Sequence, residues 1–295
     1  MKNRESLTFS SNFAGNWITA DSALLTAFKV DLRPESSLRS RATAALLYQV
    51  CQCWLALRNQ KLPPFIDGKG KRYSMNQFRY FFNTSRLPQK DSDIIDTHFK
   101  PSEEGPCPQH IVVLYRGRFY TFTPFIENGN KVCSEYLIEQ ALIEIENQGQ
   151  GVEDEKHSGI GALSANDRDT WSEHFQLLKQ TNSEAMETIS SAICLVVLSD
   201  LQPVNHSQQL KWTFINDGSD IWADKSLTFM AFGNGTIGSH SDVCYFLISN
   251  TVKPRTLRAC KLSTFSPKVT AHKLRFLCTK EDSKWQVRLL TQSDS

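Results

Sequence analysis

The chain has 295 residues, of which 40% are hydrophobic and 22% charged, as expected for a globular protein of one large or two small domains. This composition excludes a disordered or fibrous chain. No run of about 18 uncharged apolar residues occurs, and no apolar segment follows the basic residues of the N-terminus. We therefore predict a soluble intracellular protein without a membrane span or signal peptide.

The charge is unevenly distributed along the chain. Residues 243–295 carry ten Lys/Arg and three Asp/Glu, whereas residues 1–242 carry 23 basic and 28 acidic residues. A basic tail on an acidic domain is typical of a nucleic-acid or membrane-surface arm. The aromatic residues of this tail are sparse and show no stacking pattern, so no nucleic-acid partner is predicted. We expect an unrelated, poorly ordered tail over 243–295.

Eight cysteines are scattered through the chain, at positions 51, 53, 107, 133, 194, 244, 260 and 278. A zinc site needs Cys or His pairs that recur at ligand spacing. The one close pair, Cys51 and Cys53, lies in an apolar run of helical character. We expect buried reduced thiols and no metal site.

The first predicted elements are two helices. Residues 35–61 form a buried amphipathic helix, which Pro63 and Pro64 end. Its apolar residues recur at helical intervals, at Leu46, Leu47, Val50, Trp54 and Leu57. Residues 75–82 predict a short helix, and the turn-forming residues of 83–93 predict a loop behind it.

A β-hairpin is predicted next. Two β-rich runs, 110–115 and 118–125, are separated only by Arg116 and Gly117, and a two-residue connection is typical of a hairpin turn.

Three helices follow the hairpin. A serine cap at Ser134 precedes a helix over 134–147, and the glycine-rich, charged segment 148–161 is predicted to be a loop. We expect Ser164 to cap a second helix over 165–180, and Ser183 to cap a third.

Strands are predicted again in the last part of this region. Residues 193–200 are continuously apolar, as in a strand buried on both faces. Residues 222–232 alternate like a strand, and the turn at 233–235 leads into a returning strand over 236–239. Helices interleaved with strands predict the α/β class, with one mixed β-sheet and flanking helices.

The stretch FGNGTIGSHSDV, residues 232–243, contains the residues with the most chemistry. GNGTIG matches neither a dinucleotide fingerprint nor a phosphate loop, so we interpret it as a hairpin turn. His240 is a candidate catalytic base. Neighbours along a strand point to opposite faces, so His240 cannot readily share a pocket with Ser239 and Ser241. His110 and His174 are expected to be structural or solvated.

Six stretches of the chain together resemble the carnitine/choline O-acyltransferase family, and most closely its peroxisomal carnitine octanoyltransferase branch. They occur in family order and cover most of residues 10–242. They are SSNFAG (10–15), LALRNQKLPP (55–64), MNQFRYFFNTSRLP (75–88), QHIVVLYRGRFY (109–120), the GIGALS...R..W pattern (159–171) and WADKSLTFMAFGNGTIG (222–238).

The resemblance implies acyl transfer between acyl-CoA and carnitine, with no further cofactor. Family members have two related α/β lobes around a tunnel. A histidine at the lobe interface acts as general base on the carnitine hydroxyl, and a nearby carboxylate orients it. The coenzyme A site and the hydroxyls that stabilise the oxyanion belong to the second lobe. This chain is similar only to a partial first lobe, over residues 1–242.

The resemblance also places the catalytic position. The family's Asp-His pair begins at Asp242, so the histidine position is occupied by Val243. His240 lies three residues earlier, and this odd offset puts it on the opposite face of a strand, about 10 Å away. We therefore assign no catalytic residue, and we do not expect His240 to replace the missing histidine. We expect little or no transferase activity.

The sequence leaves two functions open. One is a carnitine O-acyltransferase homologue of medium-chain lipid metabolism that is truncated and without catalysis. The other is a non-enzymatic fragment that binds acyl groups or a full-length homologue. An uncovered lobe interface predicts self-association. The branch is peroxisomal and related enzymes are mitochondrial, but the C-terminus QSDS is no peroxisomal address.

Overall fold

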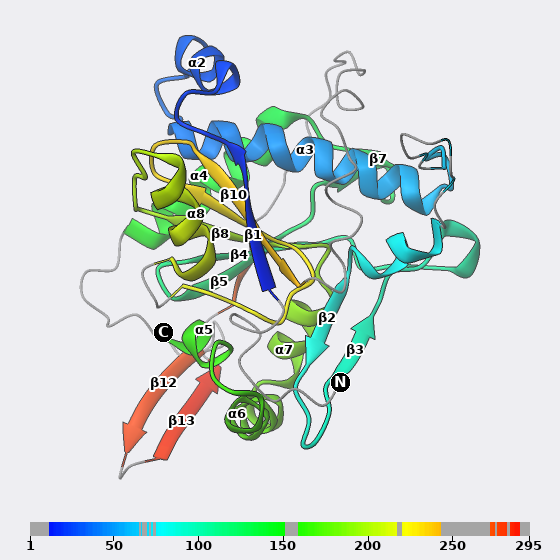
Figure 1. Ribbon diagram of the computed structural model, residues 1–295, viewed down its shortest axis with the longest axis vertical. Coiled ribbons are helices and arrows are strands. Elements are labelled where there is room, and N and C mark those ends of the chain that lie inside the picture. The colour runs from blue at the N-terminus through cyan, green and yellow to red at the C-terminus, as the bar shows by residue number, and fades with distance from the viewer. Residues whose placement is uncertain are drawn as a thin grey trace.

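A mixed seven-stranded sheet with helices on both faces forms the centre of the fold (Figure 1). The computed structural model describes residues 12–64, 66, 70, 72, 75–150, 159–216, 220–242, 272–274, 276–281 and 284–289. The strand order is β1-β10-β9-β8-β4-β5-β11. The bounds are β1 (Asn12–Ile18), β4 (Ile111–Tyr115), β5 (Arg118–Phe122), β8 (Leu195–Ser199), β9 (Thr228–Phe232), β10 (Ile237–Asp242) and β11 (His272–Leu274). The predicted α/β class is confirmed.

The middle of the sheet is a parallel set of three strands. β8 lies between β4 and β9 and runs parallel to both, with Leu195 opposite Val112 on one side and Thr228 on the other. Every residue of these strands is buried. Strands buried on both faces are continuously apolar, which is why 193–200 could be predicted as a strand.

Two tight turns reverse the chain at the sheet. Arg116 and Gly117 join β4 to β5 with φ values of 49° and 69°. Positive φ at both central residues defines a type I′ turn, whose twist matches that of the flanking strands. Gly235, with φ of 82°, turns β9 back into the antiparallel β10. Both predicted hairpins are confirmed, and β10 continues to Asp242.

Helices α3 (Leu38–Arg58) and α4 (Glu135–Gln150) pack together on one face of the sheet (Figure 1). A capping box of Ser37 and Ser40 starts α3. The buried residues of this layer include Trp54, Ile138 and Phe229. The predicted helices are confirmed, except that α4 continues beyond residue 147.

The predicted loop 148–161 is therefore wrong at both ends. Residues 148–150 belong to α4, because Gln148 donates to Glu144 one turn earlier and Gly149 lies against the Tyr115 ring, where a Cβ would be 2.5 Å from the ring. The short helix α5 (Ile160–Leu163) occupies its last two residues. Residues 151–158 lie outside the described part of the chain.

The opposite face is covered by α6 (Arg168–Thr181) and α7 (Ser183–Ser191), with Trp171, Ile189 and Met230 in its core. The predicted cap at Ser164 is wrong. Asp167 caps α6 by accepting from Thr170 N at 3.0 Å.

Ser164 instead ends α5. Its hydroxyl donates to Gly161 O at 2.7 Å and accepts from Ala223 N at 2.9 Å. The Ser164 hydroxyl is therefore engaged in these hydrogen bonds and does not cap α6, contrary to the prediction from the local sequence pattern. Ser183 is also displaced by one place, because Asn182 holds the N-cap position of α7.

The remaining elements lie around this core. The predicted short helix over 75–82 is a 3₁₀ helix, η1 (Met75–Tyr80). None of the described helices is long and apolar enough to cross a membrane. The other elements are α2 (Ala23–Val30), β2 (Thr84–Leu87), β3 (Ile94–Thr97), η2 (Ser102–Glu104), β6 (Phe125–Ile126), β7 (Lys131–Val132), α8 (His206–Ile215), β12 (Phe276–Glu281) and β13 (Lys284–Leu289).

The predicted strand over 222–232 begins only at Thr228. Residues 222–227 form a buried irregular segment, in which Asp224 and Ser226 are bonded through their backbone to β2 and only Leu227 O accepts from Leu195 N of β8. Arg86 N donates to Asp224 O at 2.8 Å, and Ser226 N donates to Thr84 O at 3.1 Å. This segment contributes to the candidate site.

Three described strands lie within residues 243–295. β11 pairs with β5, and β12 pairs with β13. The predicted division of the chain at residue 242 stays a prediction.

Candidate functional site

The candidate site lies at one edge of the sheet, where β10 ends. β10 runs antiparallel to β9, so Asp242 lies at the edge formed by the amino-terminal ends of the parallel strands. His240 is opposite Thr228 of β9 and Ala14 of β1. Val243, the position that the resemblance assigns to the catalytic base, lies outside the described residues.

His240 is buried inside the fold. Its ring is 5.4 Å from the Phe214 ring of α8, and only 2% of the residue is exposed. Gly238, two residues earlier on the same face, is covered by Thr213 of α8, whose Oγ1 would lie 2.0 Å from a Cβ at that position. A general base must come within hydrogen-bond reach of a substrate. His240, on the α8 side, offers little access to one.

Ser239 points to the other face of β10. Its hydroxyl accepts a hydrogen bond from Trp17 Nε1 at 2.8 Å, and Trp17 packs edge-on against Phe229. Ser239 and His240 therefore contact different layers, as the alternation of a strand requires. This arrangement provides no serine–histidine pair at the end of β10.

A buried ionic network lies in the segment before β9. The Asp224 carboxylate accepts from Arg168 Nη1 and from Trp171 Nε1, both at 2.6 Å. Arg168 Nε and Arg86 Nε donate to Asp93 Oδ2 at 3.0 and 2.8 Å. The four charged side chains are at most 4% exposed. Two guanidinium groups and two carboxylates thus balance one another inside the fold.

The pKa of Asp224 reflects two opposing effects. Burial raises the pKa of this carboxyl, and the Arg168 charge and the Trp171 hydrogen bond oppose that rise. The Arg168 guanidinium therefore offsets part of the cost of burying this carboxylate.

Lys225 follows Asp224 and is also buried. Its ammonium Nζ donates to Ser190 O at 2.6 Å and to Ser85 Oγ at 3.4 Å, both of them neutral oxygens. Burial lowers the pKa of Lys225 to about 7, an effect that Cys194 and Asp96 oppose.

Ser226 completes the Trp-x-Asp-Lys-Ser stretch. Its hydroxyl donates to Phe81 O at 2.9 Å, next to Asn83, whose amide donates to Pro108 O and Ser191 O. Three of the stretches that carry the family resemblance, 75–88, 159–171 and 222–238, therefore meet in one bonded cluster. The sequence identified these stretches but missed their role, which is to fix the segment that leads into β9. The only signal was the presence of charged residues in an otherwise apolar segment.

The cysteines are poor candidates for chemistry. Burial raises the pKa of Cys133 and of Cys194 to about 12. A thiol is nucleophilic as the thiolate, so both are inert at neutral pH. Within the part of the chain that the structure describes, no three His, Cys, Asp or Glu side chains gather as metal ligands.

The family model for choline/carnitine O-acyltransferases matches residues 1–245, which is more than four fifths of the chain. The chain belongs to this family.

Individual relatives agree with this assignment. The bovine peroxisomal carnitine O-octanoyltransferase is 28% identical over 244 residues, covering 75% of this chain and 38% of the relative. The human protein of that name is 30% identical, and the match covers 71% of this chain and 34% of the human protein. The mitochondrial carnitine O-acetyltransferase of Saccharomyces cerevisiae is 34% identical, and the match covers 66% of this chain and 29% of the yeast protein. The chain thus spans about a third of the length of these relatives.

Removing Arg168 should destabilise the fold strongly. Arg168→Ala leaves the carboxylates of Asp224 and Asp93 buried with one partner fewer, and breaking a buried ion pair in this way typically costs about 3–5 kcal/mol. Equilibrium unfolding in urea, followed by tryptophan fluorescence, measures the loss. The control is Arg41→Ala, which breaks the partly exposed Arg41–Glu135 pair and should cost at most about 1 kcal/mol. Equal losses in the two variants would contradict the role of the network.

Lys225 should make stability depend on pH. The unfolded chain has the ordinary lysine pKa of 10.5, whereas the pKa in the folded protein is about 7. Between these values the unfolded state binds more protons, so stability rises with pH, by at most about 1.4 kcal/mol per pH unit. Below about pH 7 Lys225 is protonated in both the folded and the unfolded state, so its contribution to the free energy of unfolding no longer changes with pH.

The measurement is the free energy of unfolding of wild type and of Lys225→Met between pH 7 and 9. The free energy of unfolding of wild type should rise relative to that of Lys225→Met as the pH rises, and their subtraction removes the opposite slope that the buried cysteines contribute. Lys179→Met, at an exposed lysine of α6, is the control and should leave the pH profile unchanged. A difference that is constant with pH would show that Lys225 is charged in the folded protein.

Proposed function

We propose that this chain forms the first-lobe core of a carnitine O-acyltransferase of medium-chain lipid metabolism. Acyl-CoA and carnitine are the proposed substrates of the whole enzyme, and no resident cofactor is proposed. Two relatives with the name peroxisomal carnitine O-octanoyltransferase, bovine and human, support the acyl class and a peroxisomal location. The motif cluster around Asp224 supports a lobe that folds as in the family.

The chain is proposed to carry out no transfer by itself. The observation that carries this proposal is the combination of Val243 at the family's base position with a buried His240 that faces α8. Loss of a general base alone typically slows a reaction by about 10²- to 10⁴-fold. His240 is buried against Phe214 of α8, so it is not proposed as a substitute.

A coenzyme A release assay tests the catalytic proposal. With octanoyl-CoA and carnitine, the purified chain should release coenzyme A no faster than the uncatalysed reaction, and His240→Ala should leave that rate unchanged. The bovine peroxisomal carnitine O-octanoyltransferase serves as the positive control. Turnover that depends on carnitine and disappears in His240→Ala would overturn the proposal.

A non-enzymatic interaction module is the second candidate, and helix α2 favours it. Leu25 is the one described α2 residue that is fully buried, whereas Leu24 and Val30 are 56% and 81% exposed. Exposed apolar residues on a protruding helix (Figure 1) favour self-association or docking of a homologue. Sedimentation velocity of the same preparation separates the candidates, since a concentration-independent monomer argues against this one.

A further inference from the structure

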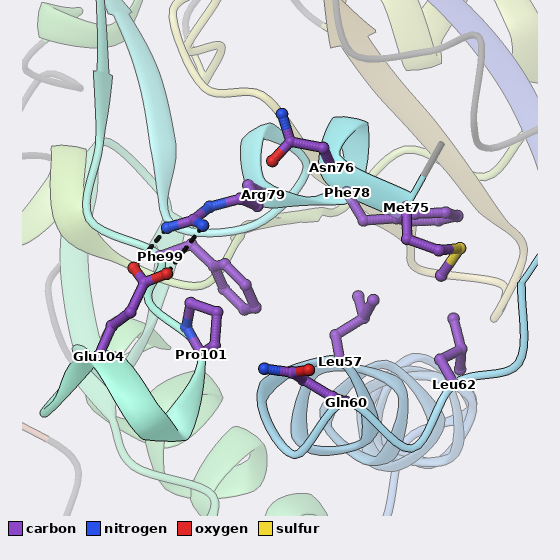
Figure 2. Close-up of a pocket in the computed structure, with 10 residues that line it drawn as sticks. All are labelled: Leu57, Gln60, Leu62, Met75, Asn76, Phe78, Arg79, Phe99, Pro101 and Glu104. Atoms are coloured by element: carbon purple, nitrogen blue, oxygen red, sulfur yellow. Dashed lines mark hydrogen bonds and ion pairs between the residues drawn. The ribbon is translucent and has the colours of Figure 1, made fainter. Parts of the chain in front are cut away.

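A pocket lies between the C-terminal end of α3 and η1. It has a volume of about 380 Å³, within the range of small-molecule sites. Its walls come from the C-terminal end of α3, from η1, and from the segment that runs from Phe99 through η2 (Figure 2). No residue of β10 and none of the Asp224 network is among the residues that line it.

The floor of the pocket is apolar. Leu57, Phe78 and Phe99 are almost fully buried beneath it. Met75 and Leu62 form one end, as Figure 2 shows. Aliphatic and aromatic carbon of this kind recognises an apolar chain, because the chain leaves water without losing hydrogen bonds.

The other end of the pocket is charged. Arg79 donates through Nη1 and Nη2 to the two carboxylate oxygens of Glu104, at 2.8 and 2.5 Å (Figure 2). The two side chains are 38% and 45% exposed. The amides of Gln60 and Asn76 add hydrogen-bonding groups along the lining. One end of the pocket is thus lined by the apolar side chains of Met75 and Leu62, and the other end by the guanidinium of Arg79, which is paired with the Glu104 carboxylate.

The Arg79–Glu104 pair itself shows which head group fits. A guanidinium binds a carboxylate through two parallel hydrogen bonds, and Glu104 already occupies this geometry. Because the pair is open to solvent, its net stabilisation is small. A ligand carboxylate can therefore replace Glu104 on Arg79, while Glu104 returns to water. Glu104 then acts as a competitor for the ligand.

We propose that this pocket binds an unbranched aliphatic carboxylate, with the head group on Arg79 and the chain along Leu57, Phe78 and Met75. The ligand is a free acid and neither a thioester nor carnitine, so the site is independent of the proposed transfer function. Each methylene that is buried should raise the affinity by up to about fourfold.

Calorimetric titration of the full chain with decanoate, below its micellar concentration, tests the proposal. Saturable binding with one site is expected, and butyrate should bind more weakly by a factor of ten or more. Arg79→Gln should weaken decanoate binding about tenfold or more, because it removes the charged partner of the head group. Glu104→Gln should strengthen it severalfold, because it removes the competitor.

Two controls make the result specific. Glu103→Gln changes the charge of the neighbouring residue in η2, which does not line the pocket, and should leave the affinity unchanged. Decanol has the chain without the charge, so its affinity should not respond to Arg79→Gln. The opposite signs expected at Arg79 and Glu104 keep the test decisive even if one variant folds poorly.

Absence of saturable decanoate binding would overturn the proposal. So would a decanoate affinity that is equal in wild type and Arg79→Gln, or one that falls in Glu104→Gln. None of these results depends on whether the chain transfers an acyl group, so failure here and failure of the proposed function can be told apart.

Discussion

The buried pair of Arg168 and Asp224 is the interaction on which the candidate site depends. Its hydrogen bond of 2.6 Å joins α6 to the segment before β9, and the Arg168 side chain is fully buried. Charges removed from water in this way are tolerated only when partners surround them. Asp93, Arg86 and Trp171 supply those partners. The network therefore fixes Asp224 and the residues beside it outside the sheet, just before β9 begins at Thr228.

The start of β9 determines what β10 can do. Thr228 pairs with His240, so the register of the hairpin follows from the position of the segment before it. A slip of one residue would turn every side chain of β10 to the other face. His240 would then lie on the Trp17 side and Ser239 on the Phe214 side. Ionic contacts in the segment before β9 thus decide which side chains of β10 face α8 and which face the α3 layer.

Periodicity and turn chemistry account for what could be predicted. The hairpin at Arg116 and Gly117 and the buried strand β8 depend on local sequence, and both are present. Ser164 and the start of β9 were wrong because distant partners override the local pattern. Ser164 bonds to Ala223, 59 residues later, and the Lys225 side chain reaches Ser85, 140 residues earlier. Contacts of this separation leave no periodic signal in the sequence.

Fold and chemistry are carried by different residues in this chain. The described bonds of the Asp224, Lys225 and Ser226 side chains run to α6, α7, β2 and Phe81, the residue after η1. Typical domains are stable by only about 5–15 kcal/mol, so breaking one buried pair removes a large share of that total. A general base contributes to the transition state and not to this network. The network therefore supports the fold without the residues that catalysis would need, and the architecture alone is no evidence of acyl transfer.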